Sequence, residues 1–365
     1  MERIPIADTF IGEEEAKAAY DVIKSGWVSS GKKVKELEKN FAEYVHAKHA
    51  LAANNGTAAL HVVLAALGIK QGDEVIVPSL TFCSTANAVL YQNAVPVLAE
   101  CDPKTFNVSV DEIKKRITKK TKAIIPVDMN GMPVDYDVML ELSEEKGIPV
   151  VFDSAESLGA EYKKKKVGGI APVHIFSFFP NKNMTTGEGG MITCSDAELA
   201  EKISILINQG QEGRYNHTHL GFNYRMNDIQ AAVGVEQLKR VPWVVKQKQR
   251  VAERYTEAFN NHPKIKAPFL PDYVAQHSWY MYAISVPIKM RDELVKQLYD
   301  AGIDTRLSFP PIHNQPYYRQ RFGYTNDSFP VTKDTWAGLI DIPIWAKLRQ
   351  EQQEYVITTL KKLCV

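Results

Sequence analysis

The chain has 365 residues, of which 45% are hydrophobic and 24% charged, and its formal net charge is +1. This length allows a large buried core and favours two domains. The balanced charge leaves no basic surface of the kind that binds nucleic acid or an anionic membrane, so neither is an expected partner.

Cysteine spacing and hydropathy indicate in which cellular compartment the protein is expected. The four cysteines are scattered without C-x-x-C spacing, so neither a zinc site nor a disulfide framework is indicated. His217 and His219 have no third ligand nearby in the sequence, and we expect no metal. No apolar run reaches membrane-spanning length, and the first residues lack a signal-peptide core. A reducing, cytoplasmic location is therefore expected.

Short apolar runs alternate with amphipathic segments between about residues 45 and 195. We expect strands at 50–53, 74–77, 95–98, 123–127, 148–153 and 173–179. Such βα alternation predicts a mainly parallel sheet with helices on both faces and ligands at the carboxyl ends of the strands. The basic run at 163–166 lies between these strands and is expected to be a solvated hairpin turn, although a polyanion site is the alternative.

A tight turn at Asn55 leads into an expected helix that ends before Gly68. The first residues of this helix are Gly56, Thr57 and Ala58. Free N–H groups and the helix dipole at such a terminus suit a phosphate, but an ordinary N-cap explains the same residues.

Asp153 and Lys182 each follow an apolar segment of the expected sheet. A lysine just past a buried strand is partly desolvated, which favours the neutral amine that can attack an aldehyde. Enzymes that use pyridoxal phosphate (PLP) hold it through such a lysine and place an acidic partner near its pyridine nitrogen. With the glycine-rich run at 187–190, the pair predicts a PLP site.

The second half of the chain begins with a loop that is capped into a long helix, from about residue 222 to Asn260. A strand at 282–286 and a helix at 291–301 follow. We place the domain boundary near Val241. The prediction is a large PLP-binding domain at 1–240 and a small α+β domain at 241–365.

An ordered series of motifs along the whole chain resembles the DegT/StrS-type sugar aminotransferases of PLP fold type I. The matching segments are Gly26 and Trp27, then residues 55–60, 72–78, 81–82, 153–156, 177–190, 223–225 and 311–313. The segment from 178 to 192 most resembles the nucleotide-sugar 4-aminotransferases of that family.

The resemblance implies a set of roles at the cofactor. Lys182 would form a Schiff base with PLP and then shuttle the proton, while Asp153 would pair with the pyridine nitrogen. Glu156 would lie near the phenolic oxygen, and Ala155 would pack under the ring. The phosphate would be bound by Ser177 together with the amides and hydroxyl of Gly56, Thr57 and Ala58.

Three further residues have an assigned role and an open alternative. Phe82 would stack on the other face of the ring, or is an ordinary core aromatic. Asn223 would reach the phosphate of a neighbouring subunit, or caps the following helix. His313 would lie near the substrate, or is structural. If Asn223 has the implied role, the chain is a homodimer with shared active sites.

The function implied is transfer of an amino group, with glutamate as the donor, to a keto group on a nucleotide-linked sugar. Relatives that act on 3-keto sugars or cyclitols are the alternative within the family. Lys182 excludes the branch that carries histidine at this position. Ser154 and Asp128 depart from the common pattern and are expected to affect substrate contacts.

Two readings from other classes are also considered. A nicotinamide oxidoreductase would need a G-x-G-x-x-G turn, which the turn at 54–57 lacks. A catalytically silent binding or regulatory protein on the same scaffold conflicts with an intact Lys182 and Asp153.

Overall fold

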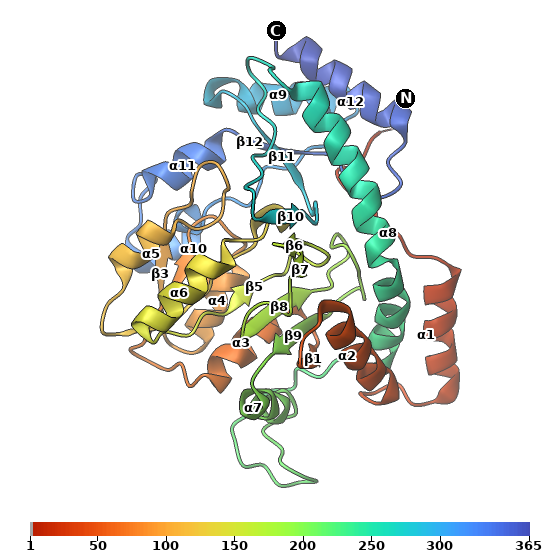
Figure 1. Cartoon of the computed structure of the whole chain (residues 1–365), viewed down its shortest axis with the longest axis vertical. Coiled ribbons are helices and arrows are strands. Elements are labelled where there is room, and N and C mark those ends of the chain that lie inside the picture. Colours follow the sequence, from red (N-terminus) through yellow and green to blue (C-terminus); the bar gives the residue numbers. More distant parts are fainter. Residues whose placement is uncertain (1–2) are drawn as a thin grey trace.

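The computed structural model describes residues 3–365, and a central sheet occupies its middle (Figure 1). Two hydrogen-bonded groups of strands, β1-β9-β8-β5 and β3-β2-β4, are linked through parallel bridges from Ile124 to Val150 and from Val127 to Asp153. The strands of this sheet are, in chain order, β1 (His49–Ala53), β2 (Glu74–Pro78), β3 (Val95–Ala99), β4 (Thr121–Ile124), β5 (Phe152–Asp153), β8 (Val173–Ser177) and β9 (Gly190–Cys194).

Strand direction agrees with the prediction of a mainly parallel sheet. The pairs β2–β3, β2–β4 and β5–β8 are parallel, and only β9 runs opposite to its neighbours β1 and β8. The expected strands lie within a few residues of the observed ones, except that 148–153 is regular only over its last two residues. Strand β9 was not expected, because the glycine-rich run before it signals a loop.

Side-chain alternation along the strands divides the buried residues between the two faces of the sheet. Ile76, Phe152 and Phe176 belong to one apolar core, whereas Val75 and Val151 belong to the other. The first core includes residues of α2 (Lys32–Val45), α5 (Val110–Arg116), α6 (Tyr136–Lys146) and α8 (Asp228–Phe259). The second includes residues of α3 (Gly56–Ala66), α4 (Ser84–Tyr91) and α7 (Ala197–Ile207). Helices therefore cover both faces, as expected.

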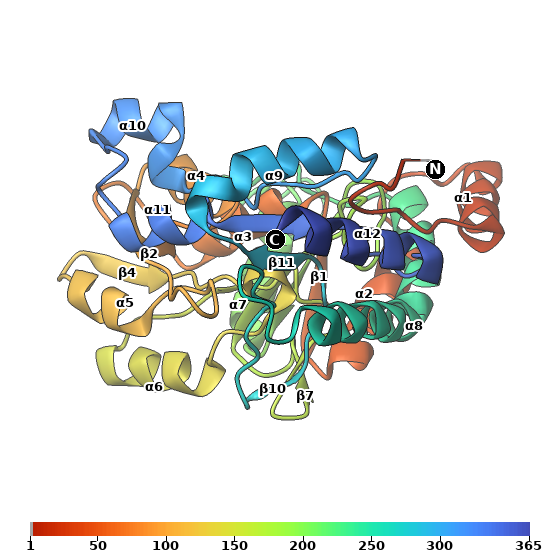
Figure 2. The same cartoon turned by 90° about the horizontal axis from the view of Figure 1, so that it is seen from above.

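A smaller α+β unit surrounds an antiparallel pair of strands, β11 (Tyr282–Ser285) and β12 (Leu339–Ile342). Its apolar core also takes in Ile4, which bridges to Ile303, so the first described residues pack with the end of the chain (Figure 2). The helices of this region are α9 (Ile288–Asp300), α10 (Pro316–Phe322), α11 (Pro330–Ala337) and α12 (Gln350–Leu363), and α1 (Glu13–Ser25) packs on α8.

Helix α8 passes through the predicted domain boundary without a break (Figure 1). Val245 packs in a core of the large sheet, whereas Val251, less than two turns later, packs in the core of the small unit. The boundary near Val241 thus falls inside one helix that belongs to both units.

Short elements complete the fold. β6 (Glu161–Tyr162) and β7 (Lys165–Lys166) form a hairpin whose turn residues, Lys163 and Lys164, both have positive φ. The basic run is therefore the hairpin turn that was predicted. β10 (Val274–Gln276) pairs with β6, and 3₁₀ turns lie at Met129–Gly131 and Ile312–Asn314. Within residues 3–365, no helix combines the length and the apolar character needed to span a membrane.

Candidate active site

A cavity of about 700 Å³ lies at the carboxyl ends of the parallel strands, where the fold predicts a ligand. Residues from both units line it. From the large unit these include Asn55, Gly56, Thr57, Ala58, Phe82, Thr85, Asp153, Ala155, Glu156, Ser177, Asn181 and Lys182, and from the small unit Tyr280, Arg306 and Phe309. Nine of the eleven predicted site residues therefore line this one cavity.

The amino terminus of α3 forms one end of the cavity. Asn55 is its N-cap, because its Oδ1 accepts a hydrogen bond from the amide of Ala58 at 2.7 Å. Gly56 and Thr57 precede that capped position and line the cavity, and the Thr57 hydroxyl lies 2.8 Å from Ser84 Oγ. Capping and an anion site are thus compatible here, since they use different N–H groups.

Glycines at this end allow close contact between α3 and the sheet. A Cβ at Gly190 would lie 2.6 Å from the carbonyl carbon of Asn55, and one at Gly56 would lie 3.0 Å from Ser177 Cβ. Only a residue without a side chain fits where β9 passes under the turn. The close packing brings the Ser177 hydroxyl beside the helix terminus.

Asp153 ends β5 and is nearly fully buried. Its Oδ2 accepts a hydrogen bond from Thr85 Oγ1 at 2.9 Å, and its Oδ1 accepts one from the amide of Ala155 at 3.2 Å. Burial raises the pKa of Asp153 to about 6, although these two hydrogen bonds oppose the rise. At neutral pH the group is still mainly a carboxylate, held in a fixed orientation, and can accept an N–H from a ring nitrogen.

Lys182 is partly buried, with 12% of its side-chain surface exposed, and its Nζ lies 3.4 Å from Glu156 Oε1 and 3.9 Å from the centre of the Tyr280 ring. Burial lowers the pKa of Lys182, but Tyr280, Glu156 and Asp153 together raise it, and the net result is a raised pKa. The sequence argument considered only desolvation. The structure shows that acidic neighbours outweigh it, so the free amine is protonated and a proton has to leave before the amine can attack an aldehyde.

Phe82 is 52% exposed, and its ring centre lies 5.2 Å from that of Phe309. A core aromatic would be buried, so the alternative proposed for Phe82 is wrong. Phe82 and Ala155 both line the cavity, so both are available to a planar ligand bound there.

The two departures from the family pattern lie beneath the cavity, outside its wall. Asp128 is fully buried and accepts hydrogen bonds from the hydroxyls of Tyr136, Ser154 and Ser157 at 2.6 to 2.9 Å. Neither Asp128 nor Ser154 lines the cavity. Their network holds the turn that follows Asp153, so they support the site without contact to a ligand in it.

Two predicted residues lie outside the cavity. His313 is completely buried with its Nδ1 2.7 Å from Ser79 Oγ, and the expected contact with substrate has no support in this position. Asn223 is exposed and does not cap the following helix, because Asn227 is the N-cap of α8. A contact between Asn223 and a neighbouring subunit requires an accessible side chain, and Asn223 has one.

Sequence reasoning missed Thr85, Tyr280 and Arg306. Thr85 lies in α4, a helix that was not predicted, and the other two come from the small unit, more than 90 positions after Lys182. Arg306 is the one cation besides Lys182 in the described cavity wall, and its Nε lies 3.2 Å from the buried Asp341. The sequence around Arg306 contains no motif that would predict its position in the cavity wall.

The residues present fit PLP. An amine for the aldehyde, a carboxylate for the pyridine nitrogen and a helix terminus for the phosphate surround one cavity, and the close approach at Gly190 shapes the phosphate end. Lys182 would hold the aldehyde carbon, Asp153 the ring nitrogen, and Gly56, Thr57 and Ser177 the phosphate.

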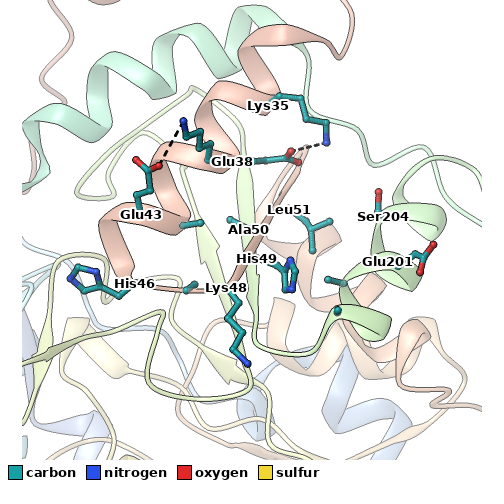
Figure 3. Close-up of a pocket in the computed structure, with 15 residues that line it drawn as sticks. Lys35, Glu38, Glu43, His46, Lys48, His49, Ala50, Leu51, Glu201 and Ser204 are labelled. Carbon is teal, nitrogen blue, oxygen red and sulfur yellow. Dashed lines mark hydrogen bonds and ion pairs between the residues drawn. The ribbon is translucent and has the colours of Figure 1, made fainter.

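A second, more open hollow of about 910 Å³ lies between α2, β1 and α7 (Figure 3). Its charges pair with each other along α2, as Lys35 does with Glu38 at 2.9 Å. Glu38 also accepts a hydrogen bond from the amide of Ala52, which covers the edge strand β1. These contacts are structural, and none of the predicted site residues lies there.

Comparison with known proteins gives the same family along the whole chain. Residues 9–361 match the model of the DegT/DnrJ/EryC1/StrS aminotransferase family. The chain is 38% identical to GDP-perosamine synthase of Caulobacter vibrioides, over 100% of this chain and 99% of that protein.

The fold of this chain is closely similar to those of solved aminotransferase structures. DesV of S. venezuelae, in complex with a ketimine intermediate, superposes with a TM-score of 0.96 at 31% identity, over 100% of this chain and 99% of that one. Spr1654 of Streptococcus pneumoniae in its PMP-form gives a TM-score of 0.95 at 30% identity, over 99% and 98% of the two chains. Spr1654 has also been solved in a PLP-form.

Proposed function

Because the chain belongs to the DegT/DnrJ/EryC1/StrS aminotransferase family, we propose that it transfers an amino group from L-glutamate to a keto group of a nucleotide-linked sugar. The family makes the chain a sugar aminotransferase, and its cofactor is PLP. The observation that carries the proposal is that one cavity brings Lys182, Asp153 and the amino terminus of α3 together.

When bound, PLP supplies an electron sink that makes a proton on the substrate carbon removable. The residues of this chain do the remaining work. Asp153 would keep the ring nitrogen protonated, and the α3 amides with Ser177 would anchor the phosphate. The Lys182 amine would be the group placed to hold and move a proton at the reacting carbon.

Glu156 tunes the position of Lys182. Its Oε2 accepts a hydrogen bond from the amide of Asn130 at 2.7 Å, which leaves Oε1 to face the Lys182 amine. We assign Glu156 to the phenolic side of the cofactor, where its fixed carboxyl group limits the directions that the lysine can take.

An amino acid donor carries a carboxylate next to the amine that it gives up. We assign that carboxylate to Arg306, whose guanidinium is available in the cavity wall beside the uncharged rings of Tyr280 and Phe309. Asp341 balances its charge when no donor is present. An arginine beside two aromatic rings can bind the carboxylate of the donor and still admit the uncharged sugar ring of the acceptor.

The acceptor is proposed from the relatives. GDP-perosamine synthases from three bacteria are 35% to 38% identical to this chain over nearly its full length, which favours a GDP-linked 4-keto sugar. A 3-keto sugar or a cyclitol is the second candidate within the family. The exposed Asn223 supports a homodimer in which each subunit completes the site of the other. We propose that this reaction takes place in the cytoplasm.

The test begins with the cofactor. Purified wild type and Lys182→Ala are mixed with PLP, their visible absorbance is recorded, and each is reduced with borohydride and mapped by peptide mass. A band in wild type that maps to Lys182 supports the proposal, and wild type saturated with PLP but without a band contradicts it.

The second step tests the substrates. Wild type is supplied with glutamate and a panel of nucleotide-linked keto sugars, and 2-oxoglutarate and amino sugar are measured together. Production of both in equal amounts supports the proposed reaction, whereas 2-oxoglutarate without an amino sugar from any member of the panel excludes that acceptor class.

A further inference from the structure

Lys248 of α8 is a buried amine that the reaction just described does not use. Its side chain is almost fully enclosed, with 5% of its surface exposed. Its Nζ donates to Asn183 Oδ1 at 2.9 Å and lies 3.4 Å from the carbonyl oxygen of Tyr280. Both acceptors are uncharged. A buried lysine without a carboxylate partner costs stability, so its presence points to a role other than folding.

The two acceptors belong to the segments that hold the Lys182 amine in place. Asn183 is the next residue after Lys182, and the ring of Tyr280 lies against Lys182 Nζ. The Asn183 amide nitrogen donates to the carbonyl oxygens of Leu158 and Ser278 at 3.2 and 2.7 Å. These two bonds fix the Asn183 side chain with its Oδ1 toward Lys248. In this orientation Oδ1 requires a hydrogen-bond donor, which Lys248 Nζ supplies.

We propose that Lys248 is a positioning residue for Lys182, acting through Asn183 and the backbone of Tyr280. The proposal rests on the proposed function, because it concerns the lysine that holds the cofactor. The amine joins the loop of Lys182 to the segment that leads into β11, at the place where α8 passes from one core to the other.

The geometry also couples the charges of the two lysines. Burial, and then the charge of Lys182, lowers the pKa of Lys248 to about 7. The charge of Lys248 also acts on His277, which is buried and whose pKa burial lowers to about 3, so it stays neutral. Because the repulsion is mutual, a cation at position 248 favours loss of the proton from the Lys182 nitrogen.

The experiment uses the full-length protein with PLP as the probe. Capture joins the Lys182 nitrogen to the aldehyde carbon of PLP and releases one water, and it is followed by the visible absorbance band. Lys248→Met removes the donor and keeps the apolar stem, Lys248→Arg keeps a permanent charge, and Lys246→Met is the control at an exposed position on the same helix.

We expect Lys248→Met to slow capture by about tenfold or more, because the amine is no longer held in its attacking position, while Lys246→Met matches wild type. We expect Lys248→Arg to lower the pH midpoint of the bound-cofactor band by about one unit, and Lys248→Met not to lower it. A merely structural role would change thermal stability in both variants and leave the midpoint unmoved.

Failure of the two proposals gives different results. If wild type captures no PLP, the proposed function fails. If wild type captures PLP at Lys182 and the Met and Arg variants match it in rate and midpoint, the role of Lys248 is overturned and the function stands. Should Lys248→Met not fold, the midpoint of Lys248→Arg decides alone, because an unchanged value overturns the role.

Discussion

Asp153 shows how one residue can be costly to the fold and necessary to the site. Its pKa is raised from 3.8 to about 6, chiefly by burial. A carboxyl group whose pKa is higher in the folded chain than in the unfolded chain stabilises the fold fully only at a pH below its unfolded-state pKa. That stabilisation is lost as the pH rises through the folded-state pKa, here about 6. Above that pH the cofactor-free protein carries a buried carboxylate that lowers its stability by about 2 to 3 kcal/mol.

Replacement of Asp153 by Asn should therefore stabilise the cofactor-free chain and damage the holoenzyme. We expect the gain in free energy of unfolding to widen from pH 5 to pH 7 and to stay flat above. Urea unfolding of both proteins between pH 5 and 8 measures it, and a gap that is the same at every pH would contradict the argument. With PLP bound, the Asn variant should convert glutamate about 10²-fold more slowly, because an amide cannot balance a protonated ring nitrogen.

Replacement of Arg306 should change KM for glutamate and leave KM for the sugar almost unchanged. Arg306→Met removes the cation assigned to the donor carboxylate, so KM for glutamate should rise about 10- to 100-fold, the value of one charge-assisted hydrogen bond. KM for the sugar should change little. Arg319→Met, at an exposed position of α10, is the control. Equal increases in both KM values would mean that Arg306 supports the cavity wall and does not select the donor.

At the scale of elements, two asparagines near the start of α8 differ in position: Asn227 is its N-cap, whereas Asn223 is exposed and is proposed to act at the neighbouring subunit. Asn227 forms a capping box with Gln230, accepting its amide at 2.9 Å. Asn227→Ala should lower the free energy of unfolding by about 1 kcal/mol. Asn223→Ala should leave it unchanged and weaken PLP binding instead. Thermal unfolding and PLP titration of the two variants give this comparison, and the reverse pattern would return the capping role to Asn223.

The strands were predictable to different degrees, and the reason is physical. β2 is buried from Val75 to Pro78 and β3 is an apolar run that is buried over most of its length, so a window of five residues reveals both. β5 has two regular residues, because its ladder with β4 consists of isolated bridges. β9 begins at Gly190, a residue that usually marks a loop and is present here because α3 passes too close for a side chain.

At the scale of the whole molecule, the predicted site residues of the large unit were accessible to sequence reasoning because each follows a strand or starts a helix. Lys182 and Asp153 are examples. Tyr280, Arg306 and Lys248 were not accessible, because they reach the cavity or its support only after the small unit folds back on the large one. No local pattern encodes that contact. His313 was placed by motif alone, and its burial shows that a matching motif does not fix exposure.

If two subunits share each active site, two inactive variants should restore activity to each other in a mixed dimer. Lys182→Ala and Asn223→Asp should each be weakly active or inactive, the second because its carboxylate repels the phosphate. When the two are mixed, unfolded and refolded together, hybrid dimers contain one site with neither defect, and activity should return. Each variant refolded alone is the control. No recovery in the mixture, with dimers present by size-exclusion chromatography, would place the whole site within one chain.

The connection between strands also sets the order in which a newly made chain can fold. β1 has β9 as its ladder partner, and Ile4 pairs with Ile303. During synthesis the first strand therefore waits until residue 194 has left the ribosome, and the extreme amino-terminal segment waits until the last fifth of the chain is made. Long-range closure of this kind folds slowly, and a chain that stops before residue 190 leaves β1 without its ladder partner β9.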